Sequence, residues 1–331
     1  RRAGACRPFG SFQMNIVILG GGGVVGQKLA QNLCARGHFK GKSITRITLA
    51  DIVMPPATAG CDTMICDITN PASVAAAIPA GTDVIYLLAA IVSAHAEAEF
   101  EAGMQINLQG TMAVLERARA LGTKPTLVFS SSIAVFGGEA PNPITDHVVL
   151  NPQTSYGTQK AIGEMLVQDY ARKGFIDGRA FRLPTISMRP GKPNRAASSF
   201  MSSILREPLN GQEAICPVGP EFPHFYLSPR MCAENLVRGA EVAEEKLGQN
   251  RAMIMPGRIW TIQQLIDAMT AVAGPGPAKL IRWESQPEIE RIVMGWRWDI
   301  RAGKSLELGL EADESFQDNI RYYLEDDLPR A

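Results

Sequence analysis

The sequence has no excess of charge of either sign. Over 331 residues, 33 Lys and Arg balance 33 Asp and Glu, and the basic residues form no stripe. Proteins that bind nucleic acid carry basic patches for the phosphates. Long apolar runs are also missing, because the run at residues 84–92 is much shorter than the roughly 20 residues of a membrane-spanning helix. We therefore expect neither nucleic acid nor a membrane as a partner.

Metal-ligand spacing is missing as well. No two cysteines stand in a Cys-x-x-Cys pair, and no two histidines are neighbours. The residues are Cys6, Cys34, Cys61, Cys66, Cys216, Cys232, His38, His95, His147 and His224. We expect reduced thiols in a cytoplasmic protein and no bound metal.

The first 13 residues lack the apolar centre that a cleavable signal peptide needs. They are basic and without pattern, and Met14 opens the first apolar strand after them. We expect residues 1–13 to be a leader or a cloning remnant, disordered and outside the fold.

Short apolar runs alternate with amphipathic stretches in the first half of the chain. Strands are expected at residues 15–19, 44–50, 63–66, 84–88, 126–130 and 179–183, and helices at residues 27–36, 71–77, 97–121 and from 155 onward. This alternation predicts an α/β fold of the Rossmann type, a doubly wound parallel sheet with helices on both faces. Beyond Pro184, where proline, serine and methionine become more frequent, helices are expected at residues 198–206, 229–246, 261–273 and 314–326.

A glycine-rich turn follows the first strand directly. Gly20, Gly23 and Gly26 stand three residues apart, and Val24 and Val25 lie between the last two, where a helix begins. Without β-carbons the backbone can approach a pyrophosphate, and the start of the helix adds partial positive charge. We predict a dinucleotide site here, in a domain over residues 14–184 to which a segment near 228–254 returns. Residues 185–331 would form mainly a smaller substrate-binding lobe.

Two acidic residues lie at the ends of the next strands. Asp51 follows Gly26 by 25 residues, close to the roughly 20-residue spacing of the acid that binds an adenosine ribose. A carboxylate there repels a 2′-phosphate, so NAD is favoured over NADP, although a strand-end aspartate can also simply start a turn. Asp67, followed by Ile68, ends the third expected strand and could meet the adenine or could cap a turn.

Tyr156 and Lys160 stand four residues apart on an expected helix, so both side chains can point into one cleft. A nearby lysine favours the phenolate and would lower the pKa of Tyr156 toward working pH, which makes Tyr156 a candidate general base. By itself this spacing also fits a solvated helix face. Ser130, Ser131 and Ser132 end an expected strand, where they could bind a substrate oxygen or cap a turn.

Taken together, these motifs resemble the extended short-chain dehydrogenases/reductases, the NAD-dependent epimerase/dehydratase family. The resemblance covers most of the chain from Met14 to about Asp326. It includes Leu88-Ala89-Ala90, Asn107 with the four residues after it, Ser130 to Gly137 and Tyr156 to Lys160. It implies that Ser132 orients the substrate oxygen, that Tyr156 is the acid/base, and that Lys160 lowers its pKa and holds the nicotinamide ribose.

The resemblance also implies further cofactor contacts. Asn107 would be the family asparagine on the central helix, and Pro184 and Ile186 would lie along the nicotinamide. The family often has a tyrosine where this chain has Phe136. Homodimers would form through the helices expected near residues 97 and 155.

Residues 91–97 and 182–209 resemble the branch of this family that acts on D-erythronate, a four-carbon sugar acid. This resemblance implies NAD-dependent oxidation of a 2-hydroxyl to a 2-keto acid. Donors for the carboxylate and hydroxyls of such an acid would come from Ser93, His95, Ser132, Arg189, Lys192, Asn194, Ser198, Ser199 and Arg230. Arg189 and Arg230 could instead pair with the chain's own acids, and His95 could be structural.

Three functions are therefore weighed. A dehydrogenase of a free sugar acid would turn over both substrate and NAD. A nucleoside-diphosphate-sugar epimerase would use the same Tyr156 and Lys160 with tightly bound NAD and would release no NADH. A non-catalytic dinucleotide sensor is disfavoured, because Ser132, Tyr156 and Lys160 are all present.

Overall fold

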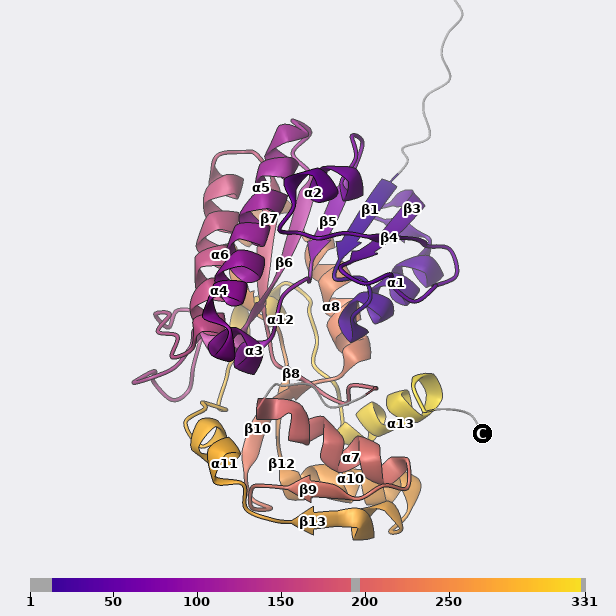
Figure 1. Cartoon of the computed structure of the whole chain (residues 1–331), viewed down its shortest axis with the longest axis vertical. Helices are drawn as coiled ribbons and strands as arrows, with labels where there is room; N and C mark the ends of the chain where they lie inside the picture. Colours follow the sequence, from indigo (N-terminus) through magenta and orange to yellow (C-terminus); the bar gives the residue numbers. More distant parts are fainter. Residues whose placement is uncertain (1–13, 192–196, 329–331) are drawn as a thin grey trace, which may run out of the picture.

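The chain folds into a parallel sheet flanked by helices, with a smaller lobe below it (Figure 1). The computed structural model describes residues 14–191 and 197–328. The strands are β1 (Met14–Leu19), β2 (His38–Phe39), β3 (Lys42–Asp51), β4 (Asp62–Ile65), β5 (Val84–Leu87), β6 (Thr126–Ser132), β7 (Asp177–Leu183), β8 (Thr185–Ile186), β9 (Ala214–Cys216), β10 (Pro223–Leu227), β11 (Ala252–Ile254), β12 (Arg258–Thr261) and β13 (Ile281–Trp283).

The α-helices are α1 (Val24–Arg36), α2 (Pro71–Ala77), α3 (Ser93–Ala98), α4 (Phe100–Gly103), α5 (Gly110–Ala120), α6 (Ser155–Arg172), α7 (Phe200–Leu209), α8 (Pro229–Glu241), α9 (Glu244–Leu247), α10 (Ile262–Ala273), α11 (Pro287–Val293), α12 (Gly303–Glu307) and α13 (Phe316–Asp326). A π-helix, η1 (Met104–Gln109), joins α4 to α5, and short 3-10 turns form η2 (Ile133–Val135), η3 (Ala197–Ser199) and η4 (Pro277–Leu280). None of the helices in the described ranges is long and apolar enough to cross a membrane.

The main sheet has the order β11-β7-β6-β5-β1-β3-β2, with β4 also paired to β3. All its pairs are parallel except β2 with β3. Strand order reverses beside β1, so the chain leaves β1 and β5 in opposite directions. Open α/β sheets bind ligands at such a point, outside the carboxyl ends of the strands.

Helices cover both faces of this sheet, as the alternating pattern predicted. On β1, Ile16 and Ile18 pack into the core formed with α1 and α8, whereas Val17 and Leu19 pack into the core formed with α2, α5 and α6. Successive strand residues point to opposite faces, so a strand buried on both faces needs an uninterrupted apolar run. The predicted doubly wound fold is confirmed.

The lower lobe has a separate apolar core. Phe200, Leu205, Leu265, Phe316 and Ile320 bring α7, α10 and α13 together. The parallel pair of β8 and β10 lies at the junction with the main sheet. The strand β11 returns to the main sheet beside β7, and α8 returns to pack on α1.

Some predicted element bounds are wrong. The single helix expected over residues 97–121 is broken between α3 and α4, because Glu99 has φ −125° and ψ 75°, outside the helical region, and from Phe100 onward it continues as α4, η1 and α5. The helix expected over residues 229–246 ends at Glu241 and restarts as α9. The short elements β9, β13, α11 and α12 were not predicted, since a few residues give too little periodicity to detect.

Candidate active site

The turn after β1 leaves no room for side chains. Gly20 has φ +87°, and a β-carbon on it would lie 2.6 Å from the main-chain nitrogen of Ala89. A β-carbon on Gly26 would lie 2.4 Å from the Gly20 carbonyl oxygen. Gly23 caps α1 without a side-chain hydrogen bond, so no side chain occupies the amides of Val24 and Val25. This turn fits a dinucleotide pyrophosphate, which such amides and the helix dipole attract.

Asp51 at the end of β3 lies against the same turn. One carboxylate oxygen accepts a hydrogen bond from the Gly22 amide at 3.0 Å, and the other accepts one from the Ile52 amide at 2.7 Å. These bonds hold the carboxylate beside the glycine turn, where an adenosine ribose would lie.

Asp67 has a local role. Its carboxylate accepts hydrogen bonds from the amide and the hydroxyl of Thr69, at 2.9 and 2.7 Å. Ile68 is buried against Gly110 of α5. The turn-capping alternative for Asp67 therefore has direct support, and its contact with adenine stays a prediction.

The segment after β5 forms the next part of the site. The amides of Leu88 and Ala89 both donate to the carbonyl of Leu19, at 2.8 and 3.0 Å, so this segment and the glycine turn are in contact. Asn107 holds the residues that follow Ala90: its side chain accepts from the Ile91 amide at 2.9 Å and donates to the Ile91 carbonyl at 3.1 Å. The π-helix η1 carries Asn107 inward, a geometry common at functional sites.

The serines at the end of β6 face different partners. Ser130 donates to the Leu87 carbonyl at 3.1 Å, which ties β6 to β5. Ser131 donates to Glu164 of α6. Ser132 accepts from the Ala134 amide at 3.1 Å, and its hydroxyl lies close enough to Tyr156 to lower the pKa of that residue. Thus the strand end brings the predicted serine and tyrosine together.

The start of α6 fixes the position of Tyr156. The Thr154 hydroxyl caps the helix by accepting from the Gly157 amide at 3.1 Å. A β-carbon on Gly157 would lie 2.2 Å from the Ala134 carbonyl oxygen, so only glycine lets the helix approach this closely. The Ser155 amide donates to Glu97 of α3 at 2.9 Å. These contacts place Tyr156 at the carboxyl edge of the sheet.

Lys160 lies beneath Tyr156 and is almost fully buried. Its ammonium donates to the Ser130 carbonyl at 2.6 Å and lies 4.7 Å from the Phe129 ring centroid and 5.7 Å from that of Tyr156. Burial lowers the pKa of Lys160 to about 7, against the opposing effect of Glu164. The lysine can therefore hold or release a proton near neutral pH.

The predicted lowering of the Tyr156 pKa is wrong. Burial of the hydroxyl raises the pKa to about 12, although the residue as a whole is partly exposed, and the neighbouring Ser132 hydroxyl lowers it only in part. Lys160 donates to a main-chain carbonyl instead of stabilising the phenolate. Spacing predicted the neighbours correctly but not their protonation, because desolvation depends on tertiary packing.

A buried ion pair behind these residues was missed. Arg182 of β7 donates through Nη2 to Glu164 at 2.8 Å and through Nε at 3.0 Å, and both side chains are about 5% exposed or less. The Arg182 guanidinium also lies 5.0 Å from the Phe136 ring centroid, which gives this phenylalanine a packing role. The sequence signal was available, since Glu164 follows Tyr156 and Lys160 at the same four-residue spacing.

A second missed pair holds the segment after β7. The Thr185 hydroxyl and His224 Nε2 of β10 are 2.8 Å apart. Burial lowers the pKa of His224 to about 3, so the imidazole is neutral and joins β8 to β10 without adding charge. Pro184 and Ile186 flank Thr185 in this segment.

The predicted substrate residues divide into three groups. Ser93 opens α3, and His95 follows on the same helix, where its Nε2 lies 3.4 Å from Glu99. Ser198 and Ser199 lie in η3, directly before α7. Lys192 and Asn194 lie outside the described residues.

Arg189 and Arg230 differ sharply. Burial, and after it the charge of Arg206, lower the pKa of the Arg189 guanidinium, and that group has no carboxylate partner within residues 14–191 and 197–328. Arg230 instead donates to Asp326 at 2.7 Å and to Glu325 at 2.9 Å. The structure thus gives Arg230 an ion pair with α13 in place of the predicted substrate contact.

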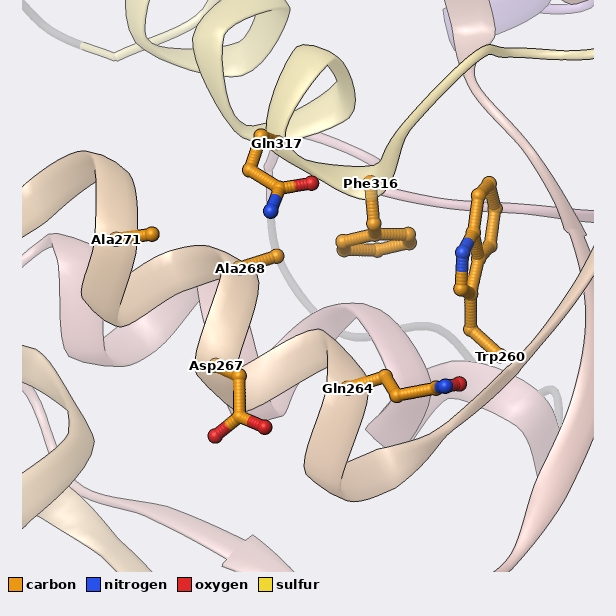
Figure 2. Close-up of a pocket in the computed structure, with 7 residues that line it drawn as sticks. All are labelled: Trp260, Gln264, Asp267, Ala268, Ala271, Phe316 and Gln317. Carbon is orange, nitrogen blue, oxygen red and sulfur yellow. The ribbon is translucent and has the colours of Figure 1, made fainter.

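Two concave surfaces lie away from these residues. One, of about 400 Å³, lies between α10 and α13 in the lower lobe, with Trp260 and Phe316 on one side and Gln264, Asp267 and Gln317 around it (Figure 2). The other, of about 360 Å³, lies between α1, α8 and α13 and includes Arg230. No group of His, Cys, Asp or Glu side chains suited to a metal occurs in the described ranges.

Comparison with known proteins gives concordant matches. The NAD dependent epimerase/dehydratase family matches residues 16–221. The D-erythronate dehydrogenase of Cupriavidus necator is 46% identical over 319 residues, 95% of this chain and 98% of that protein. The D-erythronate dehydrogenase of Haemophilus influenzae is 40% identical over 318 residues, 95% of this chain and 100% of that protein.

A solved structure is similar over the whole chain. The crystal structure described as the nucleoside-diphosphate-sugar epimerase from Agrobacterium tumefaciens superposes with a TM-score of 0.91 at 44% identity, covering 99% of this chain and 98% of that one. The matches support a nicotinamide dinucleotide as the cofactor class.

The lowered pKa of Lys160 predicts a pH effect on stability. Between about pH 7 and its ordinary pKa of 10.5, the unfolded chain holds a proton on this lysine that the folded chain has released. The unfolding free energy should therefore rise with pH, with a contribution of up to about 1 kcal/mol per pH unit from Lys160. Lys160→Met should remove that contribution in urea titrations from pH 7 to 10.

The exposed Lys173 at the end of α6 provides the control. Lys173→Met should leave the pH slope of the parent protein unchanged. Equal slopes for Lys160→Met and the parent would contradict the burial effect.

Proposed function

This chain belongs to the NAD dependent epimerase/dehydratase family, and we propose that it is a dehydrogenase that oxidises the 2-hydroxyl of a small sugar acid, D-erythronate or a close analogue, to the 2-keto acid. The observation that carries the proposal is the convergence of Ser132 at the end of β6 with Tyr156 at the start of α6 and the buried Lys160, whose ammonium lies 5.7 Å from the Tyr156 ring centroid. The identity of 46% to a D-erythronate dehydrogenase over nearly the whole chain favours the sugar acid as substrate.

The residues have distinct roles in this reaction. Ser132 donates a hydrogen bond to the reacting hydroxyl oxygen, and Tyr156 removes its proton as the C–H bond breaks. A bound oxidised nicotinamide dinucleotide supplies the hydride acceptor and a positive charge. Lys160, whose pKa is about 7, can hold a proton near neutral pH, and in this proposal that charge stabilises the tyrosinate once it forms. Its contact with the Ser130 carbonyl links this charge to the strand that carries Ser132.

NAD is the preferred form of the cofactor in this proposal. The carboxylate of Asp51, held by the Gly22 and Ile52 amides, accepts hydrogen bonds from a ribose diol and repels a 2′-phosphate. The neighbouring Ile52 offers no positive charge to offset that repulsion.

Arg189 anchors the carboxylate of the acid. Its guanidinium is partly buried and has no acidic partner in the described ranges, and Arg206 beside it, although paired with Glu207, lowers its pKa further. Guanidinium groups bind carboxylates through two parallel hydrogen bonds, and a group shielded from water gains most from such a partner. A free sugar acid provides that partner.

The alternative is a nucleoside-diphosphate-sugar epimerase, the description given to the similar Agrobacterium tumefaciens structure. Such an enzyme returns the hydride to its substrate, so free NADH does not accumulate. Release of NADH therefore separates the two functions.

The first test is NADH formation by the purified protein with D-erythronate, D-threonate and L-threonate, each with NAD and with NADP. Steady NADH formation with one acid, and much less product with NADP, is expected. An interconversion of UDP- or dTDP-sugars without free NADH would contradict the proposal and support the epimerase.

Tyr156→Phe provides the matched catalytic control. The substitution removes only the hydroxyl, so NAD should still bind while turnover falls at least about a hundredfold, the scale of one positioned acid/base. NAD binding by calorimetry and turnover by NADH absorbance measure both effects. Turnover near that of the parent protein would show that Tyr156 is not the acid/base.

Arg189→Met should act mainly on the acid. Loss of a charged hydrogen-bond pair costs about 1.5–3 kcal/mol, so KM for the acid should rise at least about tenfold, while NAD affinity stays the same. Arg189→Lys should recover part of the loss. Arg230→Met removes an equal charge from an ion pair with Asp326 and should leave KM unchanged. An equal rise of KM in Arg189→Met and Arg230→Met would contradict the proposal that Arg189 binds the carboxylate of the acid.

The protein would act as a homodimer through α4, α5 and α6. Three large apolar side chains are exposed on these helices, Phe100, Met112 and Met165. Apolar side chains that gather on one surface commonly mark an interface. Sedimentation velocity should show a dimer that Met165→Glu converts to a monomer, and a monomeric parent protein would exclude this assembly.

A further inference from the structure

Two thiols meet at the end of α1 that lies away from the dinucleotide-binding turn. Cys34 lies in the last turns of α1, and Cys61 lies directly before β4. Their sulfur atoms are 3.4 Å apart, and both residues are partly exposed. A disulfide needs an approach to about 2.05 Å, so a shift of roughly 1.4 Å, within reach of side-chain rotation, would join them.

The other described cysteines differ from this pair. Cys66, Cys216 and Cys232 are at most 2% exposed, and no sulfur–sulfur contact is found for any of them within residues 14–191 and 197–328. Cys34 and Cys61 thus combine access for a small oxidant with a partner thiol already in contact.

The pair closes a loop that belongs to the adenosine side of the site. Residues 52–61 connect Asp51 to β4. Gln27 links this loop to the glycine turn, because its amide donates to the Gly21 carbonyl at 2.7 Å and accepts from the Thr58 hydroxyl at 2.8 Å. A bond between Cys34 and Cys61 would therefore act on the segment that leaves Asp51.

The start of this loop exposes apolar side chains. Ile52, Val53 and Met54 are 62%, 72% and 52% exposed, immediately after the acid that faces the ribose. Apolar groups there are free to pack on an adenine ring if the loop that carries them can move. A restraint at the far end of the loop limits that movement.

We propose that Cys34 and Cys61 form a reversible disulfide site, oxidised by peroxides, and that the disulfide weakens dinucleotide binding by restraining residues 52–61. The inference rests only on the dinucleotide-binding part of the proposed function and holds for either substrate class. Cytoplasmic disulfides of this kind are usually transient and sense oxidants.

The oxidation consumes one molecule of hydrogen peroxide for each disulfide formed and releases two molecules of water. The thiolate of Cys34 attacks one peroxide oxygen, the O–O bond breaks, and one water and a sulfenic acid result. The Cys61 sulfur then attacks the sulfenic sulfur, forming the S–S bond and releasing a second water. The two thiols lose two protons and two electrons, and the peroxide gains both.

Cys61 is poorly suited to the first step, because the thiolate is the form that attacks a peroxide. Burial, and the hydrogen bond with Cys34, raise the pKa of Cys61 to about 12, so it stays a thiol at neutral pH. We therefore assign the first oxidation to Cys34. A small-molecule thiol reverses the reaction by attack on the disulfide.

The experiment treats the full chain with hydrogen peroxide and maps its peptides by mass spectrometry before and after dithiothreitol. We expect a crosslink between the peptides of Cys34 and Cys61, loss of two thiols, and reversal by the reductant. A protein that keeps both thiols under conditions that oxidise exposed methionines would overturn the site.

Dinucleotide affinity tests the consequence. Calorimetry with NAD should give a Kd at least about threefold higher for the oxidised than for the reduced protein. Cys34→Ser and Cys61→Ser should each abolish both the crosslink and the change in Kd, whereas Cys66→Ser, in the same region but buried, should preserve both. A crosslinked protein with an unchanged Kd for NAD would overturn the proposal that the disulfide weakens dinucleotide binding.

Failure of this inference and failure of the proposed function are distinguishable. The crosslink and the Kd are measured without any sugar acid, and the NADH assay is run on fully reduced protein. The oxidised protein at saturating NAD should keep its kcat, because Ser132, Tyr156 and Lys160 lie on β6 and α6, away from the loop.

Discussion

The buried ion pair between Glu164 and Arg182 ties together α6, β7 and β6, and two of these elements carry the proposed catalytic residues. Glu164 belongs to α6, Arg182 to β7, and Ser131, which donates to Glu164, to β6. Separating the pair would leave a buried charge without its partner, which typically costs about 3–5 kcal/mol of folding free energy. This cost holds the three elements in fixed positions relative to one another. Tyr156, Lys160 and Ser132 are neighbours because this pair holds their helix against their strand. Glu164 also counteracts the loss of charge that burial imposes on Lys160.

The two halves of the sheet edge are built in opposite ways. In the glycine turn, Gly20 and Gly26 have no space for a β-carbon, so only glycine fits at these positions. The groups this turn offers to a ligand are the main-chain amides at the start of α1. The catalytic half depends on side chains held by hydrogen bonds. The segment at Leu88 and Ala89 connects them, because its amides bond to the end of β1 while Ser130 bonds to the end of β5. A shift of β5 would therefore displace cofactor and catalytic groups together.

Prediction from the sequence succeeded where a contact is local. The strand–glycine–helix order and the four-residue spacing of Tyr156 and Lys160 are local patterns, and the structure has both in the expected places. Prediction from the sequence failed where the outcome depends on packing between residues that are far apart in the chain. The helix expected over residues 97–121 is interrupted at Glu99 and η1, which turns Asn107 toward Ile91. Arg230 matched the substrate pattern, but α13, nearly 100 residues later, provides its acidic partners.

The sequence by itself determined the doubly wound fold, the glycine turn and the shared helix face of Tyr156 and Lys160, because periodicity and spacing encode which face of an element each residue occupies. Only the tertiary structure decided the protonation of Tyr156 and Lys160, the partner of each arginine, and the contact between Cys34 and Cys61. The physical reason is that charge states and long-range pairs depend on desolvation and on which distant side chains lie within a few ångströms. Those distances follow from the packing of all the elements together.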